Sequence, residues 1–289
     1  MTRTALIDAD ELVYKISSSY QDKYYTILKD EEVLWKCRYK EEAVESIGNR
    51  DDLEMGIGYT ILTPTKRELN EKIDKVLDSI LTSTNSSSYK LFLSGPNNFR
   101  YERATLLPYK GNRTEEKPIH YGLVKSFFED RGAESIDFLE ADDLLSIHES
   151  IAERTVICSS DKDLKTVPSV NYSIKDNILT SISEDEATYN FYYQLLIGDT
   201  VDNIPSPYLL GKVKASTFLM SLVKTGNPIN YYQAIIPFYS KFLKDKDKDG
   251  NYKTSWYSGQ DVEEVLLEIG DLLWMRRTLD PTERWSPNG

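Results

Sequence analysis

Apolar runs of four or five residues recur along the chain, each followed by polar residues or glycine. Runs of this length are typical of strands buried in a sheet. Two further segments, Tyr24–Leu28 and Val33–Tyr39, flank a Lys-Asp-Glu-Glu stretch and predict a β-hairpin, and Gly48–Gly58 is interpreted as a loop. Buried strands are predicted at Thr4–Ile7, Tyr89–Leu93, Thr155–Cys158, Val170–Ile174 and Ile178–Ile182.

Amphipathic helical stretches separate these runs. In Thr65–Leu81 the apolar residues recur at helical spacing with Thr65 as the N-cap, and Thr82–Ser88 then predicts a linker. Strands that alternate with helices favour an α/β fold with a mostly parallel central sheet flanked by helices. One further helix is predicted to begin at Glu140, and another follows a tight turn within Leu209–Leu222. Helices are also predicted at Glu11–Ile16, Ile119–Asp130, Thr188–Ile197 and Val262–Met275.

The chain has 289 residues, of which 40% are hydrophobic and 28% charged, so it can bury a core in one large domain with or without an appendage. Its two cysteines, Cys37 and Cys158, indicate a reducing compartment and no disulfide framework. No apolar run approaches the roughly 20 residues that span a bilayer, and the N-terminus lacks the apolar core of a signal peptide. We therefore expect a soluble, cytoplasmic protein with no membrane partner.

Carboxylates gather where the predicted strands end. Asp8 and Asp10 follow the first strand, and Asp161 and Asp163 follow Thr155–Cys158. In open α/β sheets, ligands bind beyond the carboxyl ends of the strands. Crowded carboxylates raise one another's pKa unless a cation neutralises them, and a hard divalent ion such as Mg²⁺ prefers oxygen ligands. The other acids of this pattern are Glu140, Asp142 and Asp143 at a helix start, and Asp199 and Asp202 at helical spacing.

A plainer interpretation of these acids stays open. Acidic runs are usually solvated surface, and Asp142 and Asp143 at a helix N-terminus also make a favourable contact with the helix dipole. The strand-then-acid arrangement, however, occurs at both Asp8 and Asp161. This recurrence favours a metal site.

Two basic segments accompany the acids, although the net charge of −12, taken alone, argues against nucleic acid. From Phe99 to Pro118, cations are interleaved with aromatic residues, which suits a phosphate backbone and unstacked bases, although an exposed mixed-charge loop has the same composition. In Leu209–Leu222, lysines lie in the first turn of a helix whose amides form a phosphate site. The candidates are Arg100, Arg103, Tyr109, Lys110 and Arg113 in the first segment, and Gly211, Lys212 and Lys214 in the second.

The tail contains Lys-Asp-Lys-Asp-Lys-Asp-Gly-Asn, which matches the start of a calcium-binding loop. Such a loop needs an acidic residue at its twelfth position, and counting from Asp245 that position is Trp256. We therefore interpret this segment as a solvated turn.

The order of five motifs resembles that of the 5′-nuclease family, which contains bacteriophage 5′→3′ exonucleases, flap endonucleases and the 5′-nuclease domain of bacterial DNA polymerase I. The likeness covers most of residues 4–223, and the podovirus-type phage exonucleases look most similar because their first motif also carries a second acid like Asp10. The motifs are Leu-Ile-Asp-Ala-Asp (residues 6–10), Phe-Arg followed by Pro-Tyr-Lys-Gly-Asn-Arg (99–113), Glu-Ala-Asp-Asp-Leu (140–144), Ser-Ser-Asp-Lys-Asp-Leu (159–164), and Gly-Asp-Thr-Val-Asp-Asn-Ile-Pro (198–205) followed by a Gly-Lys-Val-Lys-Ala turn.

The resemblance implies a PIN-like α/β nuclease core over residues 1–197, with an arch or clamp at about 96–120 over the active site. It implies a DNA-binding helix–turn–helix variant at 203–222, within a C-terminal helical region at 198–289, often with a bound K⁺ ion. The implied substrate is DNA with a 5′ end, flap or nick, or an RNA primer–DNA hybrid, in phage DNA replication in the host cytoplasm.

The resemblance also implies roles for particular residues. Two divalent ions, Mg²⁺ or Mn²⁺, would bind the acids, with Lys110 and Arg113 acting on the scissile phosphate and Tyr109 stacking on a base. The implied ligands are Asp8, Glu140, Asp142 and Asp143 at the first ion, and Asp161, Asp163, Asp199 and Asp202 at or near the second.

The chain departs from the family pattern at two places. Ser94-Gly95 stands where the family commonly has an aspartate after the third strand, so either Asp10 substitutes or the first ion is held more loosely. The turn Leu209-Leu210-Gly211 lacks the first glycine of the family's Gly-hydrophobic-Gly, which weakens the expectation of K⁺.

Two other functions stay open. A non-catalytic DNA-structure-binding module would account for the missing acid, but idle carboxylates at this density would destabilise the fold. A haloacid-dehalogenase-like phosphatase would leave the acids at 140–143 and the turn at 203–215 unexplained. It would use Asp8 as nucleophile, Asp10 as acid and base, Ser94, Lys162 and the Mg²⁺ ligand Asp199.

Overall fold

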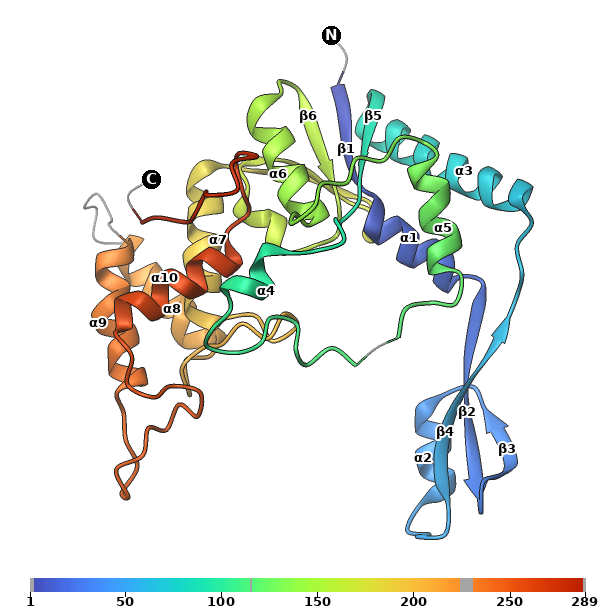
Figure 1. Cartoon of the computed structure of the whole chain (residues 1–289), viewed down its shortest axis with the longest axis horizontal. Coiled ribbons are helices and arrows are strands. Elements are labelled where there is room, and N and C mark those ends of the chain that lie inside the picture. The colour runs from blue at the N-terminus through green and yellow to red at the C-terminus, as the bar shows by residue number, and fades with distance from the viewer. Residues whose placement is uncertain (1–2, 115, 224–230, 288–289) are drawn as a thin grey trace. The chain divides into compact units, whose positions relative to one another are not determined.

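The structure is a computed structural model that describes residues 3–114, 116–223 and 231–287 (Figure 1). The chain forms two compact units. The first contains residues 1–9, 80–115 and 133–289, and the second contains residues 10–79 and 116–132. Each unit is described separately below.

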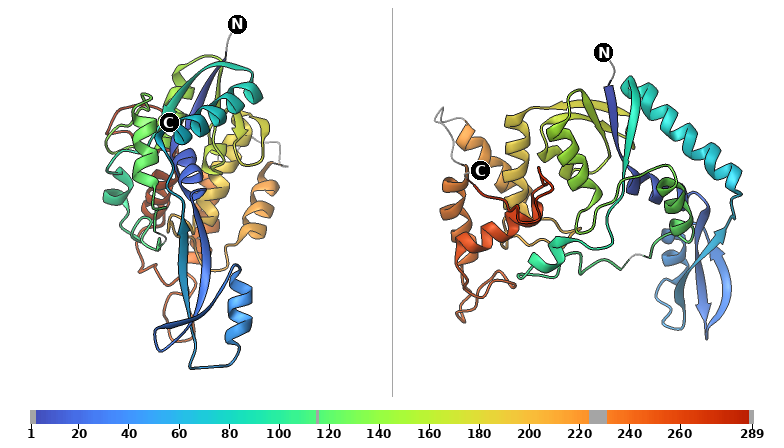
Figure 2. Two further views of the ribbon diagram at one scale, coloured as in Figure 1. Left: turned by 90° about the vertical axis from the view of Figure 1, so that its right-hand side faces the viewer. Right: turned by 45° about the horizontal axis from the view of Figure 1, so that its top comes forward.

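A five-stranded sheet with the order β5-β1-β6-β7-β8 forms the centre of the first unit (Figure 2). β1 (Arg3–Asp8) pairs in parallel with β5 (Ser86–Phe92) and with β6 (Thr155–Cys158). β7 (Ser169–Ser173) continues the parallel sheet, and only β8 (Ile178–Ile182) runs antiparallel. The predicted mostly parallel sheet is confirmed. Because β1 and β6 are adjacent and parallel, the residues that follow them meet at one edge of the sheet.

The helix α6 (Ala141–Ile151) packs on the sheet against β1, β5 and β6. Its Leu144 and Leu145 are fully buried and join Leu6 and Ile157 in one hydrophobic cluster. Asp142, in the first turn of α6, thereby lies near enough to Asp8 at the end of β1 and to Asp161 after β6 for their charges to interact.

A second hydrophobic cluster joins the helices of the C-terminal half, which lie together in Figure 1. Tyr109, from the segment after α4 (Phe99–Arg103), belongs to this cluster. The predicted domain boundary at residues 197 and 198 falls inside the first unit. Residues on both sides of it, such as Leu196 and Leu210, belong to this second cluster, and the boundary stays a prediction. The helices of the second cluster are α7 (Glu184–Ile197), α8 (Lys212–Val223), α9 (Tyr231–Leu243) and α10 (Val262–Leu273).

The second unit contains a three-stranded antiparallel sheet with the order β3-β2-β4. β2 (Gln21–Lys29) and β3 (Glu32–Cys37) form the predicted hairpin. The interpretation of Gly48–Gly58 as a loop is wrong in its second half, because β4 (Glu54–Ile61) begins there. A Cβ atom on Gly56 or Gly58 would lie 2.4 Å from the side chain of Thr26 or Tyr24, respectively. These glycines therefore allow close cross-strand contact and do not mark turns.

Helices complete the second unit and connect it to the first. Thr65 and Glu68 form a reciprocal capping box at the start of α3 (Lys66–Thr84), as the N-cap prediction required. The predicted linker Thr82–Ser88 is wrong, because the helix continues to Thr84 and β5 begins at Ser86. No helix within the described residues is both long and apolar enough to cross a membrane. The other helices here are α1 (Ala9–Ser18), α2 (Lys40–Ile47) and α5 (Tyr121–Glu129).

A glycine in α10 provides a test of the C-terminal packing. A Cβ atom on Gly270 would lie 2.2 Å from the ring of Trp285, which is 7% exposed. We expect Gly270→Ala to push this ring out of place and to lower the free energy of unfolding by about 1–3 kcal/mol. Urea denaturation followed by circular dichroism measures the effect. The matched control is Gly122→Ala in α5, where the added Cβ meets nothing within 4 Å and stability should stay equal or rise.

Candidate active site

Acids from three separate parts of the first unit line one cavity of about 310 Å³. They come from the start of α6, from the segment after β6, and from the loop after α7. The cations predicted to act in catalysis line the same cavity. Several apolar side chains complete the cavity wall. Ten of the sequence-predicted residues line it: Arg100, Tyr109, Lys110, Arg113, Glu140, Asp142, Asp161, Asp163, Asp199 and Asp202.

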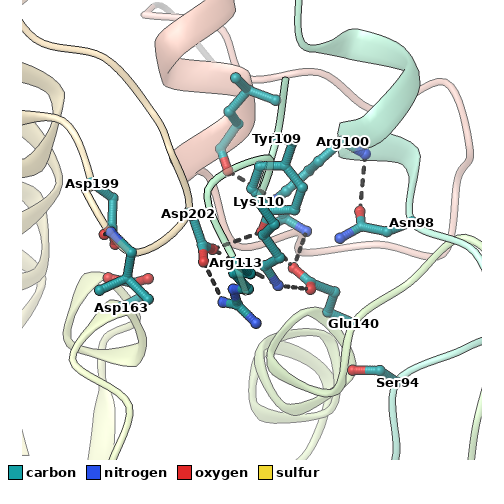
Figure 3. Close-up of polar contacts among 12 residues, drawn as sticks. Ser94, Asn98, Arg100, Tyr109, Lys110, Arg113, Glu140, Asp163, Asp199 and Asp202 are labelled. Carbon is teal, nitrogen blue, oxygen red and sulfur yellow. Dashed lines mark hydrogen bonds and ion pairs between the residues drawn. The ribbon is translucent and has the colours of Figure 1, made fainter. Parts of the chain in front are cut away.

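Glu140 and Asp202 are joined by three side chains from the Pro-Tyr-Lys-Gly-Asn-Arg motif (Figure 3). The Tyr109 hydroxyl lies 2.9 Å from Glu140 Oε2 and 2.8 Å from Asp202 Oδ2. Lys110 donates to Glu140, and Arg113 donates to Asp202. Burial alone would raise the pKa of Glu140, but the positive charges of Arg100 and Lys110 outweigh it and lower that pKa. Glu140 is therefore ionised at neutral pH.

The backbone holds this basic motif against the loop after α7. Lys110 has a φ of 54°, in the left-handed region that non-glycine residues rarely adopt. Its amide nitrogen donates to the Asp202 carbonyl at 2.8 Å, and the Asn203 side chain donates to the Pro108 carbonyl at 2.9 Å. These two bonds compensate for the strained conformation and bring the lysine onto the acids.

A second group of charges contains Asp163 and Asp199. Lys162 donates to Asp163 at 2.7 Å and also to Asp199, which is 5% exposed. The Gln194 side chain donates to Asp163 as well. Burial, followed by repulsion from Asp161, raises the pKa of Asp163 to about 6, although Lys162 opposes this rise.

Asp142 experiences the greatest crowding of negative charge. Burial raises its pKa well above the usual aspartate value, and the charges of Asp161 and Asp8 raise it further. Its Oδ1 atom is buried and has no hydrogen-bond partner within the described residues. Asp8, at the end of β1, accepts a bond from Ser159 at 2.9 Å. A buried carboxylate oxygen without a donor, surrounded by other acids, has the environment expected of a cation ligand.

The donor set fits a hard divalent cation, since it consists of carboxylate oxygens. Within residues 3–114, 116–223 and 231–287, however, no three carboxylate, imidazole or thiol groups are arranged so that they could hold one metal ion. Lys110, Lys162 and Arg113 instead bind the acids. These cations neutralise the charge that an ion would otherwise neutralise.

Ser94 occupies the place where an aspartate was expected from the resemblance. Its hydroxyl accepts a bond from the Ala141 amide at 3.1 Å, at the first residue of α6. Gly95 lies against the backbone of Ile136, where a Cβ atom would be 2.1 Å from the carbonyl oxygen. Ser94 therefore satisfies one amide at the helix N-terminus.

Asp143 and Arg100 form an internal ion pair, which corrects two predictions. Arg100 donates to both oxygens of Asp143, at 2.7 and 2.9 Å, and the two side chains are 1% and 0% exposed. Arg100 also donates to the carbonyls of Leu272 and Trp274. The structure thus supports neither a DNA contact for Arg100 nor a metal contact for Asp143, because their polar atoms are already used inside the fold.

Two further predictions from the basic segment need correction. Arg103 is mostly buried and donates to both oxygens of Asp271, at 3.0 and 2.9 Å. The ring of Tyr109 is 4% exposed and packs in the hydrophobic cluster of the C-terminal helices. A ring enclosed in this way cannot stack on a base. Tyr109 contributes its hydroxyl to the acids instead.

The remaining predicted residues lie elsewhere. Gly211 and the lysines Lys212 and Lys214 are exposed at the start of α8. The preceding Leu209 has a φ of 57°, so the turn keeps a left-handed residue without the family's glycine. Asp10 belongs to the second unit, where Tyr121 donates to it at 3.5 Å, and its role as a metal ligand stays a prediction.

Three polar contacts at the site were not predicted for a nuclease: the bridge from Lys162, the amide of Gln194 and the hydroxyl of Tyr109. The contact of Lys162 could have been predicted from the sequence, because this residue lies between Asp161 and Asp163. The contacts of Gln194 and Tyr109 could not, since their partners are 31 or more residues away.

Comparison with known proteins identifies the fold as that of the 5′-nucleases. No family model matches the chain. A structure of bacteriophage T5 5′-exonuclease with bound zinc matches 94% of this chain and 89% of its own, with a TM-score of 0.55 and 16% identity. A bacteriophage T5 protein co-crystallised with metal ions matches 93% of this chain and 89% of its own, with a TM-score of 0.53 and 14% identity.

A third match is the bacteriophage T5 flap endonuclease in a pseudo-enzyme–product complex with DNA and metal ions. It covers 94% of this chain and 99% of its own, with a TM-score of 0.51 and 11% identity. At these identities the comparisons establish the fold, and the activity is argued from the site.

The Arg100–Asp143 pair provides a test of its structural role. We expect Arg100→Met to lower the free energy of unfolding by about 3–5 kcal/mol, because Asp143 is left as a buried, unpaired charge. The double variant Arg100→Met/Asp143→Leu should recover much of this loss. Chemical denaturation measures both. A single variant as stable as the wild type would contradict the internal pairing.

The crowding at Asp142 predicts a gain in stability from removing its charge. Without divalent ions, Asp142→Asn should raise the free energy of unfolding by roughly 0.5–3 kcal/mol. The gain should shrink as the pH falls towards the raised pKa of Asp142, because protonation then neutralises the wild-type carboxyl. Mg²⁺ should raise the melting temperature of the wild type more than that of the variant. Equal Mg²⁺ shifts in differential scanning fluorimetry would contradict a role in metal binding.

Proposed function

We propose that this protein is a metal-dependent 5′-nuclease that hydrolyses phosphodiesters of DNA and leaves 5′-phosphate products. One observation carries the proposal. Acids after β6, at the start of α6 and after α7 line one cavity with Lys110 and Arg113, on a fold shared with the 5′-nucleases. Separate structural requirements do not explain this convergence, because it concentrates repulsion at Asp142.

Two Mg²⁺ or Mn²⁺ ions are the proposed cofactors. When bound, the ions would supply an activated water and stabilise the leaving oxygen. Asp142 and Asp8 are the proposed ligands on one side, together with Glu140. Asp161, Asp163, Asp199 and Asp202 are the proposed ligands on the other side, of which Asp163 and Asp199 are bound by Lys162.

The cations of the site have a second task in this proposal. Lys110 and Arg113 neutralise Glu140 and Asp202 in the free protein. If ions occupied the acids, Lys110 and Arg113 would be free to contact the scissile phosphate and to counter the charge that develops on its oxygens. Lys162 would be released from Asp163 and Asp199 in the same way. Tyr109 stays in place and orients Glu140, because its ring is held by the core.

The substrate is held by the start of α8. Lys212 and Lys214 supply positive charge beside free helix amides, a combination that binds a phosphate backbone without reading its sequence. The proposed substrate is DNA with a 5′ end, a flap or a nick, or else an RNA primer–DNA hybrid. The proposed biological role is phage DNA replication. A K⁺ ion at the turn containing Leu209 stays part of this proposal.

Two rival functions are less well supported. A phosphatase of the haloacid-dehalogenase type would leave unexplained why Glu140 and Asp142 line the cavity with Lys110 and Arg113. A binding module without catalysis would have no use for the partnerless Oδ1 atom of Asp142.

The nuclease proposal is tested with a 5′-labelled flap and a nicked duplex in Mg²⁺. The wild type should release labelled product, and EDTA should stop the reaction. Asp142→Asn should lower the rate by at least about 100-fold while the affinity for the flap stays within a few fold. Glu153→Gln, which removes an exposed acid outside the cavity, is the matched control and should leave the rate unchanged.

Other results would favour the rivals. Hydrolysis of small phosphomonoesters that depends on Asp8, with DNA left intact, would point to a phosphatase. Tight binding of flaps without metal-dependent cleavage would point to a binding module.

A further inference from the structure

Positive charge is concentrated in one part of this acidic chain. Residues 203–257 contain eight lysines and three aspartates, with no glutamate, arginine or histidine, although the whole chain has a net charge of −12. Three of these lysines form a group separate from the pair at the start of α8. They are Lys244, Lys246 and Lys248, and all are exposed.

These lysines lie on a turn that follows α9, here called the lysine turn (residues 244–253). The turn extends away from the end of α9 in Figure 1. A bridge between Lys246 and Tyr252 closes it, and Gly250 has a φ of 85° at its tip. Within the turn, Asp247 accepts bonds from the amides of Asp249 and Asn251, both at 2.9 Å. This arrangement explains why the segment resembles a calcium loop without needing an ion.

Asp245 is also used inside the structure. It accepts a bond from the Tyr208 hydroxyl and one from Lys253 at 3.1 Å. Two of the three aspartates therefore stabilise the turn, and Lys244, Lys246 and Lys248 are left facing solvent. The aspartates shape the turn and keep their negative charge, so its four lysines and three aspartates give residues 244–253 a net charge of +1.

The lysine turn is fixed to the segment that leads into α8. The Tyr208 amide donates to Thr254 Oγ1 at 3.1 Å, and the Trp256 ring nitrogen donates to the Ser206 carbonyl at 3.1 Å. At the other end, Lys214 in the first turn of α8 lies 5.3 Å from the ring centre of Phe242 in α9. The residues on either side of the lysine turn thus contact the segment before α8 and the first turn of α8.

We propose that the lysine turn is a second contact for the phosphate backbone of the duplex, beside the contact at Lys212 and Lys214. This inference rests on the proposed nuclease function, because it takes the same DNA as its ligand. The contact is independent of base sequence, since lysine recognises phosphate as a point charge. It would lengthen the stretch of duplex that the protein holds, away from the acids that do the chemistry.

The test is the triple variant Lys244→Gln/Lys246→Gln/Lys248→Gln in the Asp142→Asn background, so that DNA is bound and not cut. Fluorescence anisotropy with a long-duplex flap should show about 10-fold weaker binding or more near 0.1 M salt. The slope of log affinity against log salt should fall in magnitude by roughly 2–3, because each lost phosphate contact removes about 0.9. A melting curve establishes that the variant is folded.

The matched control is Lys40→Gln/Lys66→Gln/Lys75→Gln, which removes the same charge from exposed lysines of the second unit. The control should keep the salt slope within about 1 of the parent. In an active background, the lysine-turn variant should keep the single-turnover cleavage rate at saturating enzyme. Only the enzyme concentration needed to reach this rate should rise.

The outcomes separate the two proposals. If the parent protein cleaves flaps and the lysine-turn variant binds with unchanged affinity and slope, the lysine-turn proposal is overturned and the nuclease proposal stands. An equal loss in the control would also overturn it, because the effect would be one of total charge. If the parent neither binds nor cleaves DNA, both proposals fail together.

Discussion

Repulsion among carboxylates is the constraint on which this structure depends. Like charges a few ångströms apart in a partly buried cavity interact strongly, and each raises the pKa of the next. The chain offsets part of this repulsion by placing a cation beside several of the acids. Lys110 and Arg113 serve Glu140 and Asp202, Lys162 serves Asp163 and Asp199, and Arg100 serves Asp143. Asp142 has a buried Oδ1 atom without a hydrogen-bond partner within the described residues, so we expect it to gain most from binding an external cation.

The acids could be predicted from the sequence because local patterns locate them. Thr4–Ile7 and Thr155–Cys158 are recognisable strands, and parallel strands end at one edge of a sheet. Asp8 and Asp161 therefore had to lie near each other once β1 and β6 paired. The order of the motifs added Asp199 and Asp202, which no periodicity could have placed in the same cavity.

The basic segment could not be predicted in the same way. Phe99–Arg103 has the composition of an exposed nucleic-acid contact, yet Arg100 and Arg103 are taken up by Asp143 and Asp271, 43 and 168 residues later in the chain. Burial of a cation depends on such distant partners, and composition does not reveal them. β4 was missed for a related reason: its glycines suggest a loop until the side chains of Thr26 and Tyr24 are seen to need the space.

Arg100 donates to the carbonyls of Leu272 and Trp274. The end of α10 therefore helps to position a charged residue of the cavity, although α10 contributes no charged side chain there. The final carbonyls of a helix lack donors within the helix. Here two of them accept from the guanidinium of Arg100, which also binds Asp143. A chain shortened before Leu272 would leave Arg100 with unused donors and would let water reach Asp143. If such a fragment failed to cleave DNA, the cause would be the destabilised surroundings of the cavity. The loss of a substrate-binding segment would be the wrong explanation.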